Sequence, residues 1–241
     1  MGNRSGRLGA SRVLVALAII GVALPWQFAR GAGNALPRRQ MRHEIFYRIR
    51  TSQPMVALTF DDGPNSYTPQ ILGFLRDAGA HATFFVVGHH ALDHRDLVRA
   101  IIDGDNEVAN HTWDHPHLTA LLESEQKDEI VRGAGALAEL GVHPVWFRPP
   151  YGLISSLGVR DALALGERTV LWSMALDHEY RVHGERADNY MLRNVRPGDI
   201  ILAHDARPKT FGCLQRLLAG LRERGFAVLT VSELAAEAKP F

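Results

Sequence analysis

The sequence predicts an α/β fold in which a closed or partly closed barrel of strands is surrounded by helices. Short apolar runs rich in β-branched and aromatic residues alternate with stretches of helical periodicity, as in β/α units around a parallel sheet or barrel. About six such units fit into residues 54–241, which suits a barrel better than a bundle or a sandwich. Polar clusters directly follow several predicted strands, and chemistry in α/β barrels lies at the carboxyl ends of strands.

The first residues resemble an export signal. Arg4, Arg7 and Arg12 precede an apolar run over residues 13–24, and a proline ends the run. Because the run is shorter than the roughly 20 residues of a membrane-spanning helix, a cleaved signal peptide over residues 1–33 is favoured, and an uncleaved anchor is the alternative. The sequence therefore predicts an exported protein that is periplasmic, secreted or associated with the cell envelope.

The composition limits the partners and the metal chemistry. Residues 34–53 are polar and basic and are interpreted as a linker, which leaves one catalytic domain over 54–241. The net charge of +1 gives no field that would recruit nucleic acid, so contact with a membrane is expected only through the N-terminal segment. Cys213 is the only cysteine, which excludes an intramolecular disulfide and a cysteine zinc cluster. We expect a monomer in which histidines and carboxylates hold any metal.

The predicted elements follow from apolar periodicity. Apolar runs predict strands over Met55–Phe60, Ala82–Val87, Pro144–Phe147, Thr169–Met174, Asp199–Ala203 and Ala227–Thr230. Apolar residues spaced i, i+3, i+4 predict helices over Thr68–Ala78, Leu92–Ile102, Glu125–Leu140, Ala187–Val195 and Phe211–Arg224. Gly79, Gly104 and Gly141 follow the first three helices at positions where glycine commonly ends a helix.

Two adjacent carboxylates, Asp61 and Asp62, end the first predicted strand, before Gly63 and Pro64 turn the chain. Neighbours on an extended chain point in opposite directions, so one aspartate can bind a cation while the other faces a substrate. Aspartate and glycine are also common turn residues, so this cluster alone is weak evidence for a site.

Two histidines are spaced so that both can reach one metal ion. His111 and His115 are four residues apart, which places them on one face of a helical turn. With a carboxylate they make the His₂–carboxylate set of catalytic zinc sites that keep open coordination positions. The nearby His89, His90 and His117 are interpreted as surface histidines outside the ligand set.

Two further clusters follow predicted strands. Arg148 precedes a diproline turn, which would hold an arginine in the single orientation needed to clamp a carboxylate. His204 ends an apolar strand, where a histidine with a carboxylate near it can act as an acid near neutral pH.

The order of these motifs resembles the polysaccharide deacetylase family, the NodB-homology domain of carbohydrate esterase family 4. The motifs are TFDDGP, HTWDH, RPPYG, a strand containing Trp172, and LAHD. The resemblance covers about residues 54–235. It implies a distorted (β/α) barrel with fewer than eight units and a divalent metal, usually zinc, with Co²⁺ or Ni²⁺ as alternatives.

The resemblance also implies a role for each motif residue. Asp62, His111 and His115 would be the metal ligands, and Asp61 would be the base that removes a proton from the metal-activated water. Arg148 would hold Asp61 ionised and oriented. The Tyr151 backbone N–H would stabilise the oxyanion, His204 would protonate the departing amine, and Leu202 and Trp172 would line the pocket for the acetyl methyl group.

One motif departs from the family pattern. After the strand that contains Trp172, the family has an Asp-x-x-Asp-Trp run whose second aspartate supports the acidic histidine. An ungapped alignment puts His178 and Glu179 at the positions of that aspartate and the tryptophan. A one-residue deletion would make Asp177 the partner of His204, and we favour Asp177 over Glu179.

The sequence thus predicts a metal-dependent hydrolase that removes N-acetyl groups, or O-acetyl groups, from a carbohydrate polymer such as peptidoglycan or a chitin-type oligosaccharide. Two alternatives remain open at this point. One is a related amidase or deformylase that acts on another N-acyl substrate or a lipid-linked sugar. The other is a catalytically silent wall-binding protein, which the altered fourth motif favours.

Overall fold

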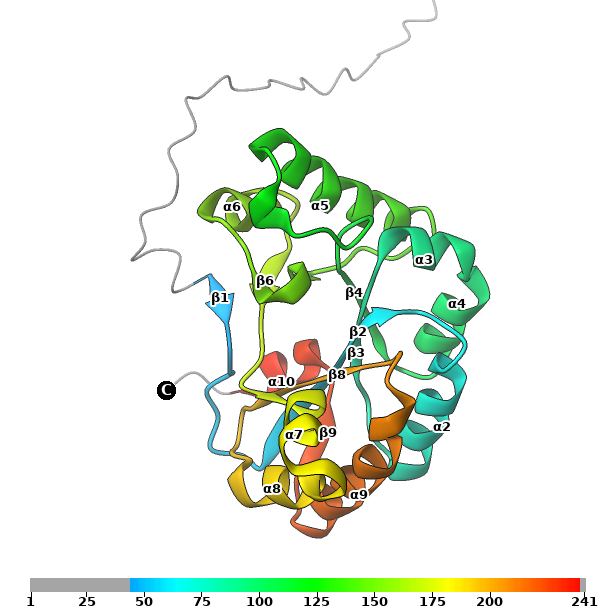
Figure 1. The fold of residues 1–241 in the computed structure, drawn as a ribbon, viewed down its shortest axis with the longest axis vertical. Coiled ribbons are helices and arrows are strands. Elements are labelled where there is room, and N and C mark those ends of the chain that lie inside the picture. The colour runs from blue at the N-terminus through cyan, green and yellow to red at the C-terminus, as the bar shows by residue number, and fades with distance from the viewer. Residues whose placement is uncertain (1–43, 239–241) are drawn as a thin grey trace, which may run out of the picture. The chain divides into compact units, whose positions relative to one another are not determined.

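The computed structural model describes residues 44–238, so the predicted signal or anchor over 1–33 lies outside the described residues. Within residues 44–238, parallel strands form a curled sheet, and helices pack around this sheet (Figure 1). Among the helices of this part of the chain, none is both long and apolar enough to cross a membrane.

The described strands pair in the order β1-β6-β5-β4-β3-β2-β8-β7, and β9 also pairs with β2. Every one of these pairs is parallel. The strands are β1 (Ile45–Phe46), β2 (Met55–Gly63), β3 (Thr83–Val86), β4 (Glu107–Asn110), β5 (Trp146–Phe147), β6 (Arg168–Val170), β7 (Met174–Ala175), β8 (Ile200–His204) and β9 (Ala227–Leu229). Because all the strands run the same way, their carboxyl ends meet at one rim.

The longest strand, β2, shows how the sequence creates two cores. Val56, Leu58 and Phe60 face the helices and belong to the larger apolar cluster. Met55 and Ala57 face the opposite way and belong to a second cluster. This period of two follows from the pleat of the strand, and both faces are apolar because the sheet is covered on both sides.

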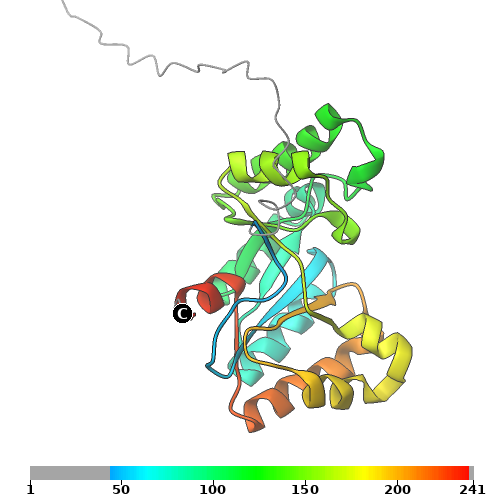
Figure 2. The same ribbon diagram turned by 90° about the vertical axis from the view of Figure 1, so that its left-hand side faces the viewer.

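Helices connect most successive strands. They are α2 (Thr68–Ala78), α3 (Gly88–Asp93), α4 (Arg95–Asp103), α5 (Glu123–Ala138), α6 (Ser156–Ala164), α7 (Leu176–His183), α8 (Ala187–Asn194), α9 (Phe211–Glu223) and α10 (Val231–Glu237). In both views of the described domain, α5 and α6 lie at one end and α7, α8 and α9 at the other (Figures 1 and 2). Val231 and Leu234 of α10 pack into the second core cluster.

The structure differs from the predicted elements at two places for clear reasons. The predicted helix over Leu92–Ile102 is two helices, because His94 has a non-helical backbone (φ −125°, ψ 52°) that separates α3 from α4. The predicted strand over Thr169–Met174 is two short strands, β6 and β7. Between them, the carbonyls of Val170 and Leu171 accept hydrogen bonds from the Arg148 side chain.

Other elements were not predicted at all. Strand β4 and helices α6 and α7 lie in stretches whose apolar residues are too few or too irregular to show a period. Helix α10 was missed although Val231, Leu234 and Ala235 have helical spacing. Strand β1 lies within residues 34–53, which the sequence suggested as a linker, and it pairs with β6. The Phe46 ring packs edge-on against Trp146, so this part of the expected linker belongs to the folded domain.

Candidate active site

The two adjacent aspartates at the end of β2 have different surroundings because the backbone changes course between them. Alternation along β2 places Asp61 on the same face as Ala57 and Thr59, and its side chain is buried. Asp62 has a left-handed backbone (φ 72°), and the pairing of β2 with β3 shifts register between Asp61 and Gly63. This irregularity lets the carboxylate of Asp62 lie near that of Asp61 instead of on the opposite face.

Three predicted ligands converge at this point. Donor atoms of Asp62, His111 and His115 all lie within 4.8 Å of one another. His111 Nε2 lies 3.5 Å from Asp62 Oδ1, and His115 Nε2 lies 3.1 Å from the same oxygen. Asp62 Oδ1 is buried. Although the two imidazole nitrogens are close to it, no group among the described residues is oriented to donate a hydrogen bond to this oxygen. Two imidazoles and a carboxylate aimed at one point are suited to a divalent cation.

The backbone orients the two histidines. His111 Nδ1 donates a hydrogen bond to the Arg148 carbonyl (2.6 Å), which leaves Nε2 free to face Asp62. His115 has a left-handed backbone (φ 58°), and its N–H donates to Thr112 Oγ1. Thr112 is also left-handed (φ 68°). The His111–His115 segment is therefore a strained loop after β4 and not the brief helical turn that the spacing suggested.

A buried glutamate on α5 holds the same loop. Glu129 Oε2 accepts hydrogen bonds from the backbone N–H groups of Trp113 (3.1 Å) and Asp114 (2.9 Å). Glu129 was not predicted from the sequence, because a single glutamate in an amphipathic helix looks like any solvated charge. Asn110 was also missed: its Oδ1 accepts from the Thr112 N–H, and its Nδ2 donates to Glu167.

Arg148 is fully buried and contacts Asp61 directly. Its Nη1 donates to Asp61 Oδ1 and to Thr59 Oγ1, both at 2.7 Å. The guanidinium carbon lies 4.0 Å from the centre of the Phe85 ring. Burial lowers the pKa of Arg148, and the neighbouring Asp61 carboxylate opposes this shift. One oxygen of Asp61 is thus held by the arginine, while Oδ2 lies 3.8 Å from His111 Nε2.

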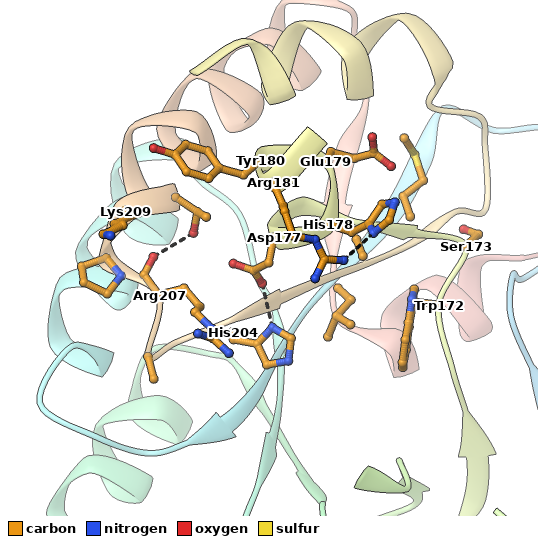
Figure 3. Close-up of a pocket in the computed structure, with 16 residues that line it drawn as sticks. Trp172, Ser173, Asp177, His178, Glu179, Tyr180, Arg181, His204, Arg207 and Lys209 are labelled. Carbon is orange, nitrogen blue, oxygen red and sulfur yellow. Dashed lines mark hydrogen bonds and ion pairs between the residues drawn. The ribbon is translucent and has the colours of Figure 1, made fainter. Parts of the chain in front are cut away.

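His204 lies across the site from the ligand cluster and contacts Asp177. Its Nδ1 and Asp177 Oδ2 are 2.7 Å apart (Figure 3), and its Nε2 lies 4.0 Å from Asp62 Oδ2. Burial disfavours the charged ring, but the hydrogen bond with Asp177 and the charges of nearby aspartates outweigh it, so the pKa of His204 is raised. The alternative partner of His204, Glu179, points to another histidine: its Oε2 lies 3.4 Å from His183 Nε2.

The remaining predicted residues surround these groups. Trp172 and Leu202 line a cavity of about 810 Å³ together with His204. Tyr151 has a left-handed backbone (φ 59°) in the turn that follows Arg148, and its ring is exposed and stacks on His117 at a centroid distance of 3.8 Å. The structure therefore brings all ten predicted site residues to one rim of the sheet.

The sequence of this chain is similar to those of known proteins. Residues 48–170 match the family model described as polysaccharide deacetylase. The chain is 33% identical, over 79% of its length, to the peptidoglycan-N-acetylglucosamine deacetylase of Bacillus cereus, of which it covers 92%. The chain belongs to the polysaccharide deacetylase family. It is also 33% identical to the chitooligosaccharide deacetylase of Sinorhizobium fredii, covering 77% of this chain and 94% of that protein.

A solved polysaccharide deacetylase has the same fold. The Bc1960 peptidoglycan N-acetylglucosamine deacetylase, solved in complex with a hydroxamate (an N-oxidanyl-benzamide), superimposes with a TM-score of 0.75 at 29% identity, over 82% of this chain and 95% of that one. The predicted family and the predicted distorted (β/α) barrel with fewer than eight units are confirmed. The chain is accordingly a carbohydrate deacetylase.

Proposed function

We propose that this polysaccharide deacetylase hydrolyses N-acetyl groups of a cell-wall glycan, with zinc held by Asp62, His111 and His115. The observation that supports this most strongly is the convergence of these three donors beside Asp61, whose Oδ1 is held by a buried arginine. A site built only for structural metal would not need a separately clamped carboxylate next to the ligands.

The residues present fit a divalent cation. The buried Asp62 Oδ1 has no hydrogen-bond partner among the described residues, and a cation between it and the two imidazoles would satisfy it. Two nitrogen donors and one oxygen donor favour zinc, while Co²⁺ and Ni²⁺ accept the same set. When bound, the cation lowers the pKa of a water molecule and polarises the acetamide carbonyl.

The side chains around the cluster divide the proton transfers between them. Asp61 accepts a proton at Oδ2, because Oδ1 is held by Arg148. His204 delivers a proton from Nε2 to the leaving amine, while Asp177 at Nδ1 fixes the ring orientation and favours its protonated form. We assign the Tyr151 N–H to the developing oxyanion, and Trp172 and Leu202 to the acetyl methyl group.

The relatives and the N-terminal sequence support a proposal for the substrate and the location of the enzyme. The two curated relatives described above are named for peptidoglycan and for chitooligosaccharides, and both are N-acetylated glycans. We propose one of these classes as the substrate. The arginines and the apolar run at the N-terminus support export to the cell envelope.

Chelation tests the metal requirement. Protein treated with a chelator and then freed of it by desalting should release no acetate from N-acetylglucosamine oligomers or from peptidoglycan. Added Zn²⁺ should restore the rate, because the cation activates the attacking water. The readout is acetate release by a coupled assay, with metal content measured on the same samples. Full activity in metal-free protein would contradict the proposed mechanism, and no release by metal-loaded protein on any acetylated polymer would favour a silent wall-binding protein.

A further inference from the structure

The cavity beside His204 is lined by cations from two separate segments. Arg181 lies on α7, whereas Arg207 and Lys209 follow β8 within a few residues of His204. All three side chains are exposed to solvent. Figure 3 shows Arg181 and Arg207 drawn on the two sides of the Asp177–His204 pair.

These cations have no charge partner in the described part of the chain. The cavity is lined by two carboxylates, and both contact histidines: Asp177 contacts His204, and Glu179 contacts His183. Within residues 44–238, no carboxylate lies within ion-pair distance of the three cations. Among the described residues, the Arg181 side chain makes one hydrogen bond, from Nη2 to His178 Nδ1 (2.9 Å), and this uncharged acceptor does not cancel its charge.

The same cavity includes the residues assigned to the acetyl group. Trp172, Leu202 and His204 line it together with the three cations. A group bound by the cations would therefore share one cavity with the side chains assigned to the acetamide, and its volume of about 810 Å³ is in the range of small-ligand sites. Arginines bind carboxylates and phosphates through paired N–H donors, and lysine adds a point charge.

We propose that this cavity binds an anionic group, a carboxylate or a phosphate, on the N-acetylated sugar or on its direct neighbour in the glycan. The proposal rests on the deacetylase function proposed above and narrows its substrate to acidic glycans. A neutral chitin-type oligomer leaves the three charges without a partner. Peptidoglycan strands supply a carboxylate on the lactyl ether of every second sugar.

The experiment compares substrates that differ only in this charge. Acetate release is measured on peptide-free peptidoglycan strands, on the same strands with their carboxyl groups converted to amides, on neutral N-acetylglucosamine oligomers, and on such oligomers phosphorylated at O6. Each substrate is given to the wild type, to Arg181→Gln, to Arg207→Gln and to Lys209→Gln. Lys127→Gln, which removes an exposed cation from α5, is the matched control.

We expect kcat/KM on one anionic substrate to exceed that on its neutral counterpart by about tenfold or more, because charge-assisted hydrogen bonds are lost with the charge. Arg181→Gln and Arg207→Gln should each reduce this preference several-fold, with little change on the neutral oligomers, and Lys127→Gln should not. A preference for intact over amidated strands would identify the bound anion as a carboxylate. A preference for phosphorylated over neutral oligomers would identify it as a phosphate. High salt should weaken the preference, since the cations are exposed.

Equal kcat/KM on charged and neutral substrates would overturn the inference and leave the deacetylase function intact. Equal losses on both in the arginine variants would also overturn it. If no substrate releases acetate, the proposed function fails. Binding of intact and amidated strands to Asp61→Asn protein then decides the inference separately: tighter binding of the intact strands supports it, and equal binding overturns it.

Discussion

Asp61 and Asp62 are adjacent in the chain, and we propose different chemical roles for them. Asp61 Oδ1 accepts a hydrogen bond from Arg148. Asp62 Oδ1 instead lies 3.1 Å from His115 Nε2 and 3.5 Å from His111 Nε2. The left-handed backbone of Asp62 produces this separation. A proton-transfer group and a ligand should therefore respond differently to the same substitution.

Asp61→Asn should keep the metal and lose turnover. The amide oxygen of asparagine can still accept the hydrogen bond from Arg148 Nη1, but the side chain can no longer take a proton. We expect kcat to fall by about 100-fold or more, the usual contribution of general base catalysis. Metal content and acetate release measured on the same preparation check this.

Asp62→Asn is the comparison for that experiment. It should lose metal and activity together, because a neutral amide is a weaker ligand than a carboxylate. If Asp61→Asn lost the metal and Asp62→Asn kept it, the roles of the two aspartates would be reversed. Thermal unfolding of both variants controls for damage to the fold.

The predictability of site residues depended on whether each belonged to a motif. The proposed ligands and the proposed base stand in short, ordered motifs. Asp177 could be found by allowing a one-residue deletion, and its Oδ2 lies 2.7 Å from His204 Nδ1. Glu129, which holds the ligand loop through backbone N–H groups, could not be found. Its role depends on how α5 packs against that loop, and a helical pattern does not encode this.

At the scale of elements, strands with a clear apolar run were predictable even when short, and strands without one were not. Helix α2 was predicted with the observed bounds, and Gly79 ends it in a left-handed conformation (φ 62°). Strand β4 has only Val108 and Ala109 between two polar residues, and β1 is two residues within a polar segment, so neither stands out as an apolar run. Strand β1 is positioned by pairing with β6, which is distant in sequence, and β4 is positioned by pairing with the preceding strand β3.

Strand β1 gives a prediction about the start of the folded domain. A protein that begins at residue 54 loses β1 and the buried Ile49. A protein that begins at residue 44 keeps both. We expect the shorter protein to unfold about 5 °C lower or more, since burial of each large apolar side chain contributes about 2 kcal/mol.

Thermal unfolding of these two proteins and of the full chain checks this boundary. The protein that begins at residue 44 should match the full chain in acetate release per mole. Equal melting temperatures for the two shortened proteins would instead support a linker that extends to residue 53, as the sequence suggested.

The stability of the whole domain should depend on one buried carboxyl group. Glu167 is 1% exposed, and burial raises its pKa to about 8, although a hydrogen bond from Asn110 opposes the shift. The folded protein therefore keeps this proton at pH values where the unfolded chain, with an ordinary pKa of 4.5, has released it. Its contribution to stability is present below about pH 4.5 and is lost as the pH rises towards 8.

Glu167→Gln should remove this dependence. The wild type should lose free energy of unfolding between about pH 5 and pH 8, at about 1.4 kcal/mol per pH unit at most, and the variant should lose less over the same range. Urea titrations at several pH values measure both curves. Parallel curves would show that Glu167 is ionised in the folded protein at neutral pH.

The left-handed residues of the site bear on how this enzyme can be engineered. Within residues 44–238, four of the five such non-glycine residues, Asp62, Thr112, His115 and Tyr151, lie at the rim that holds the site. Each costs about 1 kcal/mol or more, and glycine would relieve it. Glycine lacks the carboxylate of Asp62, the hydroxyl of Thr112 and the imidazole of His115, however, so thermostabilised versions of this deacetylase should be sought in the helical layer and not at these three positions.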